Sequence, residues 1–380
     1  MSNRSTLFTG SVAGFPGRTT SILVEGGAVT WVGEGRPPRR AGEHLTAGPG
    51  ELIAPGFIDL QVNGFAGHDA GGGPEAIAAI SAALPATGVT GFLPTIISRP
   101  VRAGAHFVAD AAEAARAASG ARVLGAHVEG PFLNAAFRGA HDRACLAEPT
   151  PERVEVLAAA RPRLVTLAPE LPGALAAIAR LRREGVVVSA GHTGADYEQG
   201  RRAIDAGVRF ATHLYNAMLP IHHRRPGIVT ALLLDRRVTA GLIADGEHVH
   251  AAACEQVARL KGPTRLALTT DQTAAAGAPA GSFTLSGRPV LSDGVSVRLE
   301  DGTLAGSAAT MDELVRRMAR LPGMSPARAL TMASAAPARV LGERFLGRLG
   351  VGSCADLVIL DAALQVRLTM VGGEVKHSRP

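Results

Sequence analysis

The stretch that decides the fold is APGFIDLQVNG, residues 54–64, in which apolar and polar side chains alternate. This alternation is typical of a β-strand, because successive side chains of a strand point to opposite sides. The apolar members are Ile58, Leu60 and Val62, and the polar members are Asp59, Gln61 and Asn63. Burying three polar groups on one side of a strand is costly unless they have partners. The polar side is therefore expected to face a functional site.

Apolar, β-branched runs of this kind recur along the chain, and most end near a small or polar residue. There are eight of them: Leu52–Asn63, Val89–Ser98, Val123–Gly130, Leu164–Glu170, Val186–His192, Phe210–Asn216, Thr239–Asp245 and Leu266–Asp271. Stretches with helical spacing separate most of them, such as residues 75–84, 103–118, 174–183 and 251–260. The link between residues 216 and 239 is the least clear, because Pro220 and Pro226 interrupt it. Eight strand-then-helix units predict an α/β protein with a TIM-like (β/α)8 barrel.

The two ends of the chain have a different pattern. Residues 1–53 and 348–380 contain short alternating strands, as in SILVEGGAVTWVGEG and ADLVILDAALQVRLTMVGGEV. We expect these flanks to pair in one small β-sandwich domain that is discontinuous in sequence. Residues 54–347 would then form the barrel, with a β-rich insertion near residues 278–301.

Composition limits the class of protein. An apolar fraction of 46% and a charged fraction of 19% fit a globular chain with a large core. The net charge of +6 raises the question of nucleic-acid binding. However, the arginines are dispersed, aromatic residues are only 4% of the chain, and no basic run interleaves with them, so nucleic acid is not an expected partner. A modest positive field favours a small anionic metabolite instead.

The sequence also indicates the cellular compartment in which the protein is expected. Three cysteines are too few and too scattered for a disulfide framework. The first residues, MSNRSTLFTGSVAG, lack the apolar core of a signal peptide, and no run of about 18 apolar residues could span a membrane. We therefore expect a cytoplasmic, soluble protein without a membrane partner.

Metal-competent side chains gather at the predicted strand ends, which meet at one mouth of a barrel. They are Glu129 in GAHVEGP, His192 in SAGHTG, His213 in ATHLYNAM and Asp271 in LTTDQT. A carboxylate and two imidazoles suit a divalent metal such as zinc, and Asp271 could act as a base for a water molecule. Each residue alone is more often structural, as a hydrogen-bonded histidine or a helix cap. Their coincidence at four of eight strand ends favours a metallohydrolase.

Further motifs extend this pattern, namely PGFIDLQVNG, HVEGPFLN, GHTGA, THLYNAM, IADGEHV, TTDQTAAAG and LAGSA. From about residue 20 to the end, the set resembles the N-acetylglucosamine-6-phosphate deacetylases of the amidohydrolase superfamily. The resemblance implies metal-dependent hydrolysis of N-acetylglucosamine 6-phosphate to glucosamine 6-phosphate and acetate. The alternatives are N-acetylgalactosamine 6-phosphate or a cyclic amide as substrate, and a scaffold without catalytic activity.

The resemblance also implies a set of metal ligands. Glu129, His192 and His213 would hold one divalent ion, expected to be zinc, with iron, manganese and cobalt also compatible. Many amidohydrolases carry His-x-His at the end of the first strand, where this chain has Gln61 and Asn63. Neutral amides are poor zinc ligands, so one ion is expected rather than two. Three residues are expected to lie around the ligands without binding the metal: Gln61, Asn63 and His127. The alternative for the two amides is a buried pair with no role in chemistry.

Other residues receive roles through the same resemblance. Asp271 would accept the proton of the attacking water and return it to the leaving amine. His141 would bind substrate and stabilise the oxyanion. The substrate-binding set is Asn216, Ala217, Arg224, His248, Leu304, Ala305 and Gly306. Within this set, Arg224 would reach the phosphate from the neighbouring subunit of a homodimer.

Overall fold

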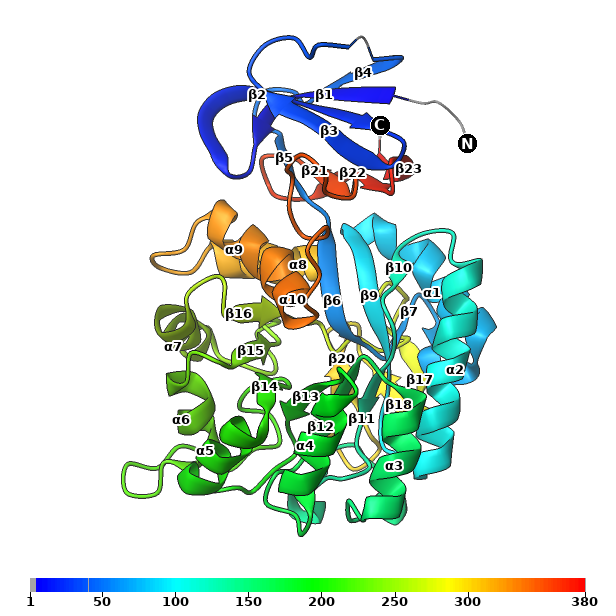
Figure 1. The fold of residues 1–380 in the computed structure, drawn as a ribbon, viewed down its shortest axis with the longest axis vertical. Helices are drawn as coiled ribbons and strands as arrows, with labels where there is room; N and C mark the ends of the chain where they lie inside the picture. The colour runs from blue at the N-terminus through cyan, green and yellow to red at the C-terminus, as the bar shows by residue number, and fades with distance from the viewer. Residues whose placement is uncertain (1–4, 40, 380) are drawn as a thin grey trace.

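The structure is a computed structural model that describes residues 5–39 and 41–379, and a parallel β-barrel forms its centre (Figure 1). The barrel strands are β6 (Phe57–Val62), β9 (Val89–Ile96), β11 (His127–Glu129), β12 (Leu164–Leu167), β13 (Val187–Ala190), β14 (Val208–Ala211), β15 (Thr239–Leu242) and β16 (Leu266–Leu268). A short strand, β10 (Arg122–Val123), precedes β11 and also pairs with β9. A parallel bridge between Val62 and Gln272 joins the first strand to the segment after the last. The predicted fold class is confirmed.

Helices follow the strands and cover the outside of the barrel (Figure 1). They are α1 (Pro74–Ala83), α2 (Val101–Ala117), α3 (Pro151–Ala160), α4 (Ala174–Arg183), α5 (Tyr197–Ala206), α6 (Gly227–Leu234), α7 (Ala251–Lys261), α8 (Met311–Ala319), α9 (Pro326–Ala333) and α10 (Ala335–Val340). The unclear link after residue 216 contains α6, which begins directly after Pro226. Proline is tolerated at such a position, because the first N–H groups of a helix have no partner within it. Among the described residues, no helix is both long and apolar enough to cross a membrane.

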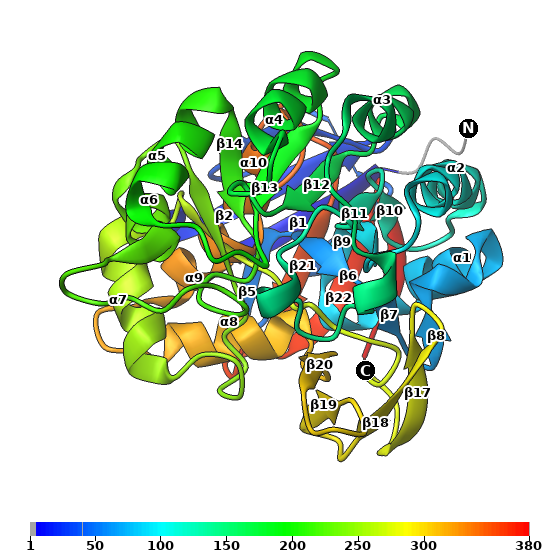
Figure 2. The ribbon, with the colours of Figure 1, turned by 90° about the horizontal axis from the view of Figure 1, so that it is seen from below.

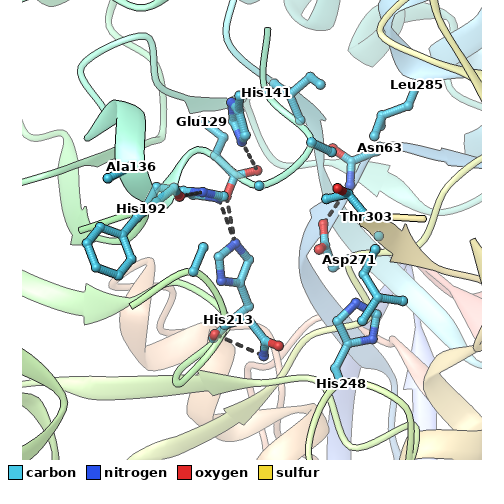
Figure 3. Close-up of a pocket in the computed structure, with 18 residues that line it drawn as sticks. Asn63, Glu129, Ala136, His141, His192, His213, His248, Asp271, Leu285 and Thr303 are labelled. Carbon is cyan, nitrogen blue, oxygen red and sulfur yellow. Dashed lines mark hydrogen bonds and ion pairs between the residues drawn. The ribbon is translucent and has the colours of Figure 1, made fainter. Parts of the chain in front are cut away.

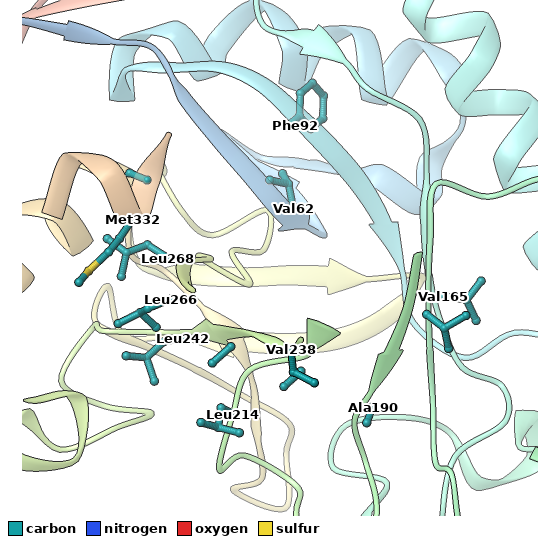
Figure 4. Close-up of a cluster of buried hydrophobic side chains, with 14 of the residues drawn as sticks. Val62, Phe92, Val165, Ala190, Leu214, Val238, Leu242, Leu266, Leu268 and Met332 are labelled. Carbon is teal, nitrogen blue, oxygen red and sulfur yellow. The ribbon is translucent and has the colours of Figure 1, made fainter. Parts of the chain in front are cut away.

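The main hydrophobic core lies between the barrel and its helices (Figure 4). It contains Val62, Phe92, Val165, Leu242 and Leu268 from the strands or their ends, all of them buried. Strands of a parallel barrel are covered on both sides, which explains why their sequences are almost continuously apolar. A separate buried cluster packs α10 against the strands, with Ile58, Leu60 and Phe210 among its members.

Both ends of the chain contribute to one further sheet (Figure 1). Its strands are β1 (Ser5–Val12), β2 (Phe15–Glu25), β3 (Ala28–Gly33), β4 (Glu43–Thr46), β5 (Leu52–Pro55), β21 (Leu357–Leu360), β22 (Val366–Val371) and β23 (Glu374–Ser378). Within it, β5 pairs with β1 and β21, so the two ends of the chain meet at this strand. The stretch 52–63, predicted as one strand, is therefore divided at Gly56. A Cβ atom at Gly56 would lie 2.3 Å from the side chain of Thr90, so the close approach at this junction requires glycine.

The predicted β-rich insertion forms a small antiparallel sheet at the periphery of the barrel (Figure 2). Its strands are β17 (Gly281–Leu285), β18 (Arg288–Ser292), β19 (Ser296–Arg298) and β20 (Leu304–Ser307). The sheet extends beyond residue 301, and β20 brings residues 304–306 back to the barrel. A two-stranded ribbon, β7 (Gly64–Phe65) with β8 (His68–Asp69), follows the first barrel strand.

The first barrel strand differs from the simple alternation expected of it. Its pairing with β9 is irregular between Asp59 and Val62, which changes the direction of the side chains along the strand. Leu60 packs in the cluster beside α10, whereas Val62 packs in the main core. Asp59 does not face the barrel mouth, because its carboxylate accepts hydrogen bonds from Thr269 and Thr270 instead. The expectation of one polar side facing the mouth was thus wrong for Asp59.

This buried carboxylate links the first strand of the barrel to the last. Asp59 accepts from the Thr270 hydroxyl at 2.6 Å, and from the backbone N–H groups of Thr270 and Gln61 at 3.3 and 3.2 Å. Burial raises the pKa of Asp59 to about 6, although these hydrogen bonds oppose the rise. The folded state therefore favours the protonated side chain at mildly acidic pH.

We predict that Asp59 makes stability depend on pH. Because its folded pKa is raised from an ordinary 3.8 to about 6, its stabilising contribution is present below about pH 4 and is lost as the pH rises to about 6. The free energy of unfolding of the wild type, relative to Asp59→Asn, should fall by up to roughly 3 kcal/mol across this window and stay level above it. Urea unfolding from pH 4 to 8 measures this difference. The surface variant Asp205→Asn is the control, and identical pH profiles for Asp59→Asn and the wild type would refute the prediction.

Candidate active site

The carboxyl ends of the barrel strands surround a cavity of about 350 Å³ (Figure 3). These ends lie away from the terminal sheet, because β6 starts beside that sheet and runs from it (Figure 1). The residues predicted from sequence that line the cavity are Asn63, Glu129, His141, His192, His213, Asn216, Ala217, His248, Asp271, Leu304 and Gly306. The structure thus brings together side chains from strands far apart in the sequence.

Three side chains converge on one point of the cavity wall (Figure 3). Glu129 Oε1 lies 3.2 Å from His192 Nε2 and 3.0 Å from His213 Nε2, and the two Nε2 atoms lie 3.1 Å apart. Ligands about 2.0–2.1 Å from a tetrahedral zinc ion lie roughly 3.3 Å from one another. The triangle formed by these three atoms therefore has a suitable size for one divalent ion.

The charges of this group also suit a cation. Burial opposes the ionised form of Glu129, but the adjacent imidazole rings of His192 and His213 outweigh it and hold the pKa of this carboxyl well below its ordinary value. Burial likewise opposes the charged form of His213, yet contact with Glu129 raises the pKa of this imidazole to about 9. The Glu129 carboxylate thus favours a positive charge beside it. In this structure a proton on His213 can provide that charge, and a bound metal ion would provide it instead.

The tautomer of His192 fits a ligand role. Its Nδ1 donates to the backbone carbonyl of Phe137 at 2.9 Å, which leaves the Nε2 lone pair directed at Glu129 and His213. His213 Nδ1 is buried and has no hydrogen-bond partner among the described residues.

Three of the key residues adopt a backbone conformation that is uncommon for side chains other than glycine. The φ angles are 50° for His192, 28° for His213 and 51° for Asp271. Each residue follows a barrel strand directly or within three positions, so the turn directs its side chain into the mouth. Such strain costs about 1–3 kcal/mol per residue and clusters at functional sites.

The two amides of the first strand contact the central carboxylates. Gln61 Nε2 donates to Glu129 Oε2 at 3.0 Å, and Asn63 Nδ2 donates to Asp271 Oδ1 at 2.7 Å. Both carboxylates are thereby oriented by neutral amide donors. The remaining amide oxygens, Gln61 Oε1 and Asn63 Oδ1, are buried without a partner among the described residues.

Asp271 has the properties of a base that works near neutral pH. Burial, and then the charge of Glu129, raise its pKa to about 7, while nearby His213 and His248 and the hydrogen bond from Asn63 lower it. A cation bound at Glu129 would lower this pKa further. The carboxylate lies in the cavity wall across from the metal-competent group (Figure 3).

Two further histidines line the cavity, His141 and His248. His141 Nδ1 accepts from the Ser98 backbone N–H at 3.0 Å, so the ring proton of the neutral form resides on Nε2. Burial, and then the neighbouring His192, hold the pKa of His141 well below its ordinary value. His248 Nδ1 lies 2.7 Å from Asp245 Oδ2, which orients this ring.

Some predicted residues do not line the cavity. His127 is buried beneath it, with Nδ1 donating to the Leu60 carbonyl at 3.1 Å and Nε2 lying 2.8 Å from the Thr166 hydroxyl. Gln61 reaches the site only through Glu129, and Ala305 is buried in β20. Arg224 is exposed on the loop before α6 and does not reach the cavity of its own chain.

The sequence did not reveal several residues that line the cavity, among them Ile97, Phe137, Leu285 and Thr303. Ile97 follows β9, so the rule that barrel sites use strand ends could have identified it. Leu285 ends β17 of the small sheet, and Thr303 directly precedes β20 of the same sheet. No local pattern reveals that this sheet reaches the cavity. Phe137 lies in a 3-10 helix (Ala135–Phe137) within the loop after β11.

Comparisons with known proteins agree with this architecture. Residues 52–376 match the profile of the Amidohydrolase family. The chain is 39% identical over 339 residues to an N-acetylgalactosamine-6-phosphate deacetylase of Escherichia coli O157:H7, covering 87% of this chain and 89% of that protein. It is 38% identical over 353 residues to the human N-acetylglucosamine-6-phosphate deacetylase, covering 89% of this chain and 86% of the relative.

Among solved structures, a mutant N-acetyl-D-glucosamine-6-phosphate deacetylase from Mycobacterium smegmatis, in complex with N-acetyl-D-glucosamine-6-phosphate, superposes with a TM-score of 0.91. It is 34% identical, and the match covers 99% of this chain and 100% of the other. A family match across most of the chain, relatives of this identity and a shared overall structure lead to one conclusion. The chain belongs to the amidohydrolase family.

Proposed function

We propose that this protein is a metal-dependent deacetylase that hydrolyses N-acetylglucosamine 6-phosphate to glucosamine 6-phosphate and acetate. The observation that carries the proposal is the triangle of Glu129, His192 and His213, with Asp271 in the same cavity. A metal-ligand group and a separate base are the two components of metal-assisted amide hydrolysis. The names of the human and mycobacterial relatives support the choice of substrate.

The three ligands would hold one divalent ion, most readily zinc, with iron, manganese or cobalt also compatible with this donor set. A bound ion would supply Lewis-acid polarisation of the acetyl carbonyl and would make a water molecule more acidic. The amides Gln61 and Asn63 occupy the carboxylate oxygens that could otherwise serve a second ion. One ion therefore suits this site better than two.

Side chains of the protein would carry out the proton transfer and stabilise the negative charge that develops on the carbonyl oxygen. Asp271 accepts a proton from the attacking water and returns it to the amide nitrogen, so that the nitrogen leaves as an amine while acetate forms. The Nε2–H of His141 faces the cavity, where it can donate to the carbonyl oxygen as negative charge develops. Asn63 holds Asp271 through Oδ1 and leaves the other carboxylate oxygen for the proton transfer.

Binding of the sugar phosphate would use the other side of the cavity. His248, oriented by Asp245, would contact the sugar phosphate, and Asn216 and Ala217 border the same space. Arg224 would complete the phosphate site from the neighbouring subunit of a homodimer. Its exposed position on a loop supports this proposal, because the side chain is free to extend toward another chain.

A second candidate substrate is N-acetylgalactosamine 6-phosphate. The relative from Escherichia coli O157:H7 that bears this name is as similar to the chain as the human protein. The two sugars differ in the configuration of one ring hydroxyl group, which leaves the chemistry at the acetyl group unchanged.

The proposed function is tested by elemental analysis of the purified protein together with an acetate-release assay on both sugar phosphates. We expect about one divalent ion per chain, loss of activity on chelation and recovery on adding zinc. The ratio of kcat/KM values decides between the epimers. Metal-free protein that releases no acetate after zinc addition would instead indicate a scaffold without catalytic activity.

Replacement of the proposed base should separate catalysis from metal binding. We predict that Asp271→Asn lowers kcat by roughly 10²–10⁴-fold, because the amide cannot accept the proton. The ion should remain, since Asp271 is not part of the ligand group, and the amide oxygen can still accept from Asn63. The exposed variant Asp205→Asn should have wild-type turnover. Unchanged turnover in Asp271→Asn would exclude Asp271 as the base.

Gly306 offers a test of how closely the insertion fits against the base. A Cβ atom there would lie 2.7 Å from the backbone oxygen of Asp271 and 2.8 Å from the Thr273 side chain. We predict that Gly306→Ala lowers kcat by roughly 10²-fold, since a shift of about 1 Å in a catalytic group has an effect of that size. Gly302→Ala is a matched control, because Gly302 has a similar φ of +85° but open space around it. Equal loss of kcat in both variants would trace the effect to backbone strain alone.

A further inference from the structure

Glu170 lies close to the active site, yet nothing in the chemistry described above uses it. It follows β12, whose neighbours in the barrel are β11 and β13. Glu129 is the last residue of β11, and His192 follows β13 by two residues. Glu170 is only partly buried and is not among the residues that line the active-site cavity. Because its carboxylate does not line the cavity, we looked for its role in its hydrogen bonds.

The Glu170 carboxylate accepts three hydrogen bonds. Asn134 Nδ2 donates to Oε1 at 2.8 Å, and the Gly194 backbone N–H donates to the same oxygen at 2.7 Å. The Thr193 hydroxyl donates to Oε2 at 2.5 Å. Hydrogen bonds to an ionised acceptor are short and are stronger than neutral ones. Glu170 thus joins the loop after β11 to the loop after β13.

Both of these loops hold His192. On one side, Asn134 donates its backbone N–H to the His192 carbonyl at 3.0 Å. In the same segment, the Phe137 carbonyl accepts from His192 Nδ1 at 2.9 Å. On the other side, Thr193 and Gly194 are the two residues that follow His192. The carboxylate of Glu170 therefore binds the segment that fixes the imidazole ring and the segment that fixes its backbone.

This arrangement matters because His192 has a strained backbone, with φ at 50°. A residue other than glycine keeps this conformation only where its surroundings enforce it. The contact between the two loops is close, since a Cβ atom at Gly194 would lie 2.6 Å from the Phe137 ring. Hydrogen bonds from both loops to one carboxylate would keep them at this distance.

We propose that Glu170 is a positioning residue for the metal ligand His192. By holding residues 134–137 against residues 193–194, it keeps His192 Nε2 directed at the ion. The proposal rests on the proposed function only in requiring that Glu129, His192 and His213 bind a metal. Outer partners of metal ligands commonly change metal affinity by about 10–100-fold when they are removed.

The test is zinc affinity, measured on apoprotein by equilibrium competition with a chromophoric chelator. Glu170→Ala should raise the Kd for zinc by about 10–100-fold. Glu170→Gln should remain closer to the wild type, because its amide oxygen can still accept from Asn134 and Gly194. The matched control is Glu198→Ala, which removes a carboxylate of the same length from the exposed start of α5 and should leave the Kd unchanged. A wild-type Kd in Glu170→Ala would overturn the proposal.

A second comparison separates positioning from general stability. In a His192→Ala background, Glu170→Ala should have no further effect on the Kd, since the ligand through which Glu170 acts is absent. The same fold-change in both backgrounds would mean that Glu170 acts elsewhere and would overturn the proposal. Circular dichroism and urea unfolding of each apoprotein verify that the compared variants are folded.

The outcome for Glu170 is independent of the substrate. If the wild type binds zinc but releases no acetate from either sugar phosphate, the proposed function fails, while the affinity comparison still decides the role of Glu170. If the wild type binds no zinc at all, the ligand group itself is refuted, and the proposal for Glu170 is refuted with it.

Discussion

Closure of the barrel between its first and last strands is the constraint on which the active site depends. The backbone N–H groups of Asn63 and Gly64 both donate to the Gln272 carbonyl, at 2.9 and 3.2 Å. Nearby, the buried carboxylate of Asp59 accepts hydrogen bonds from the hydroxyl groups of Thr269 and Thr270, which directly follow the last strand. These contacts place Asn63 beside Asp271 and thereby fix the distance from the base to Glu129, three strands away around the sheet. If the first and last strands separated, the active-site residues would move apart although every side chain would still be present.

The active site of the closed barrel contains strained backbone and buried charges, and both would destabilise a protein if they had no stabilising neighbours. Histidines and an aspartate adopt left-handed backbone conformations, and ionisable groups are buried next to one another. Each feature persists because a neighbour stabilises it: a backbone carbonyl at His192, an amide at Asp271, a second amide at Glu129. The rigid strands around them provide the stability that such a site requires.

The barrel and its mouth were predictable because both follow from local patterns. Parallel strands covered on two sides are apolar throughout, and their polar ends meet at one edge, so Glu129, His192, His213 and Asp271 could be grouped from sequence. The direction of Asp59 could not, because an irregularity in strand pairing depends on the neighbouring strand. The role of the insertion was also hidden, since the contact of Leu285 and Thr303 with the cavity arises only from tertiary packing. The junction at Gly56 was missed because apolar residues lie on both sides of it, although they belong to two different sheets.

The pairing of β5 with β21 has a consequence for how the chain is made. Ile53 and Ile359 face each other in this pair although some three hundred residues lie between them. During synthesis on the ribosome, the amino-terminal strands emerge first and must wait with an open edge until the entire barrel has been translated. Contacts of such long range form slowly, and unpaired edges invite association with other chains. Nascent chains stalled before residue 357 should therefore depend on chaperones far more than the finished protein does.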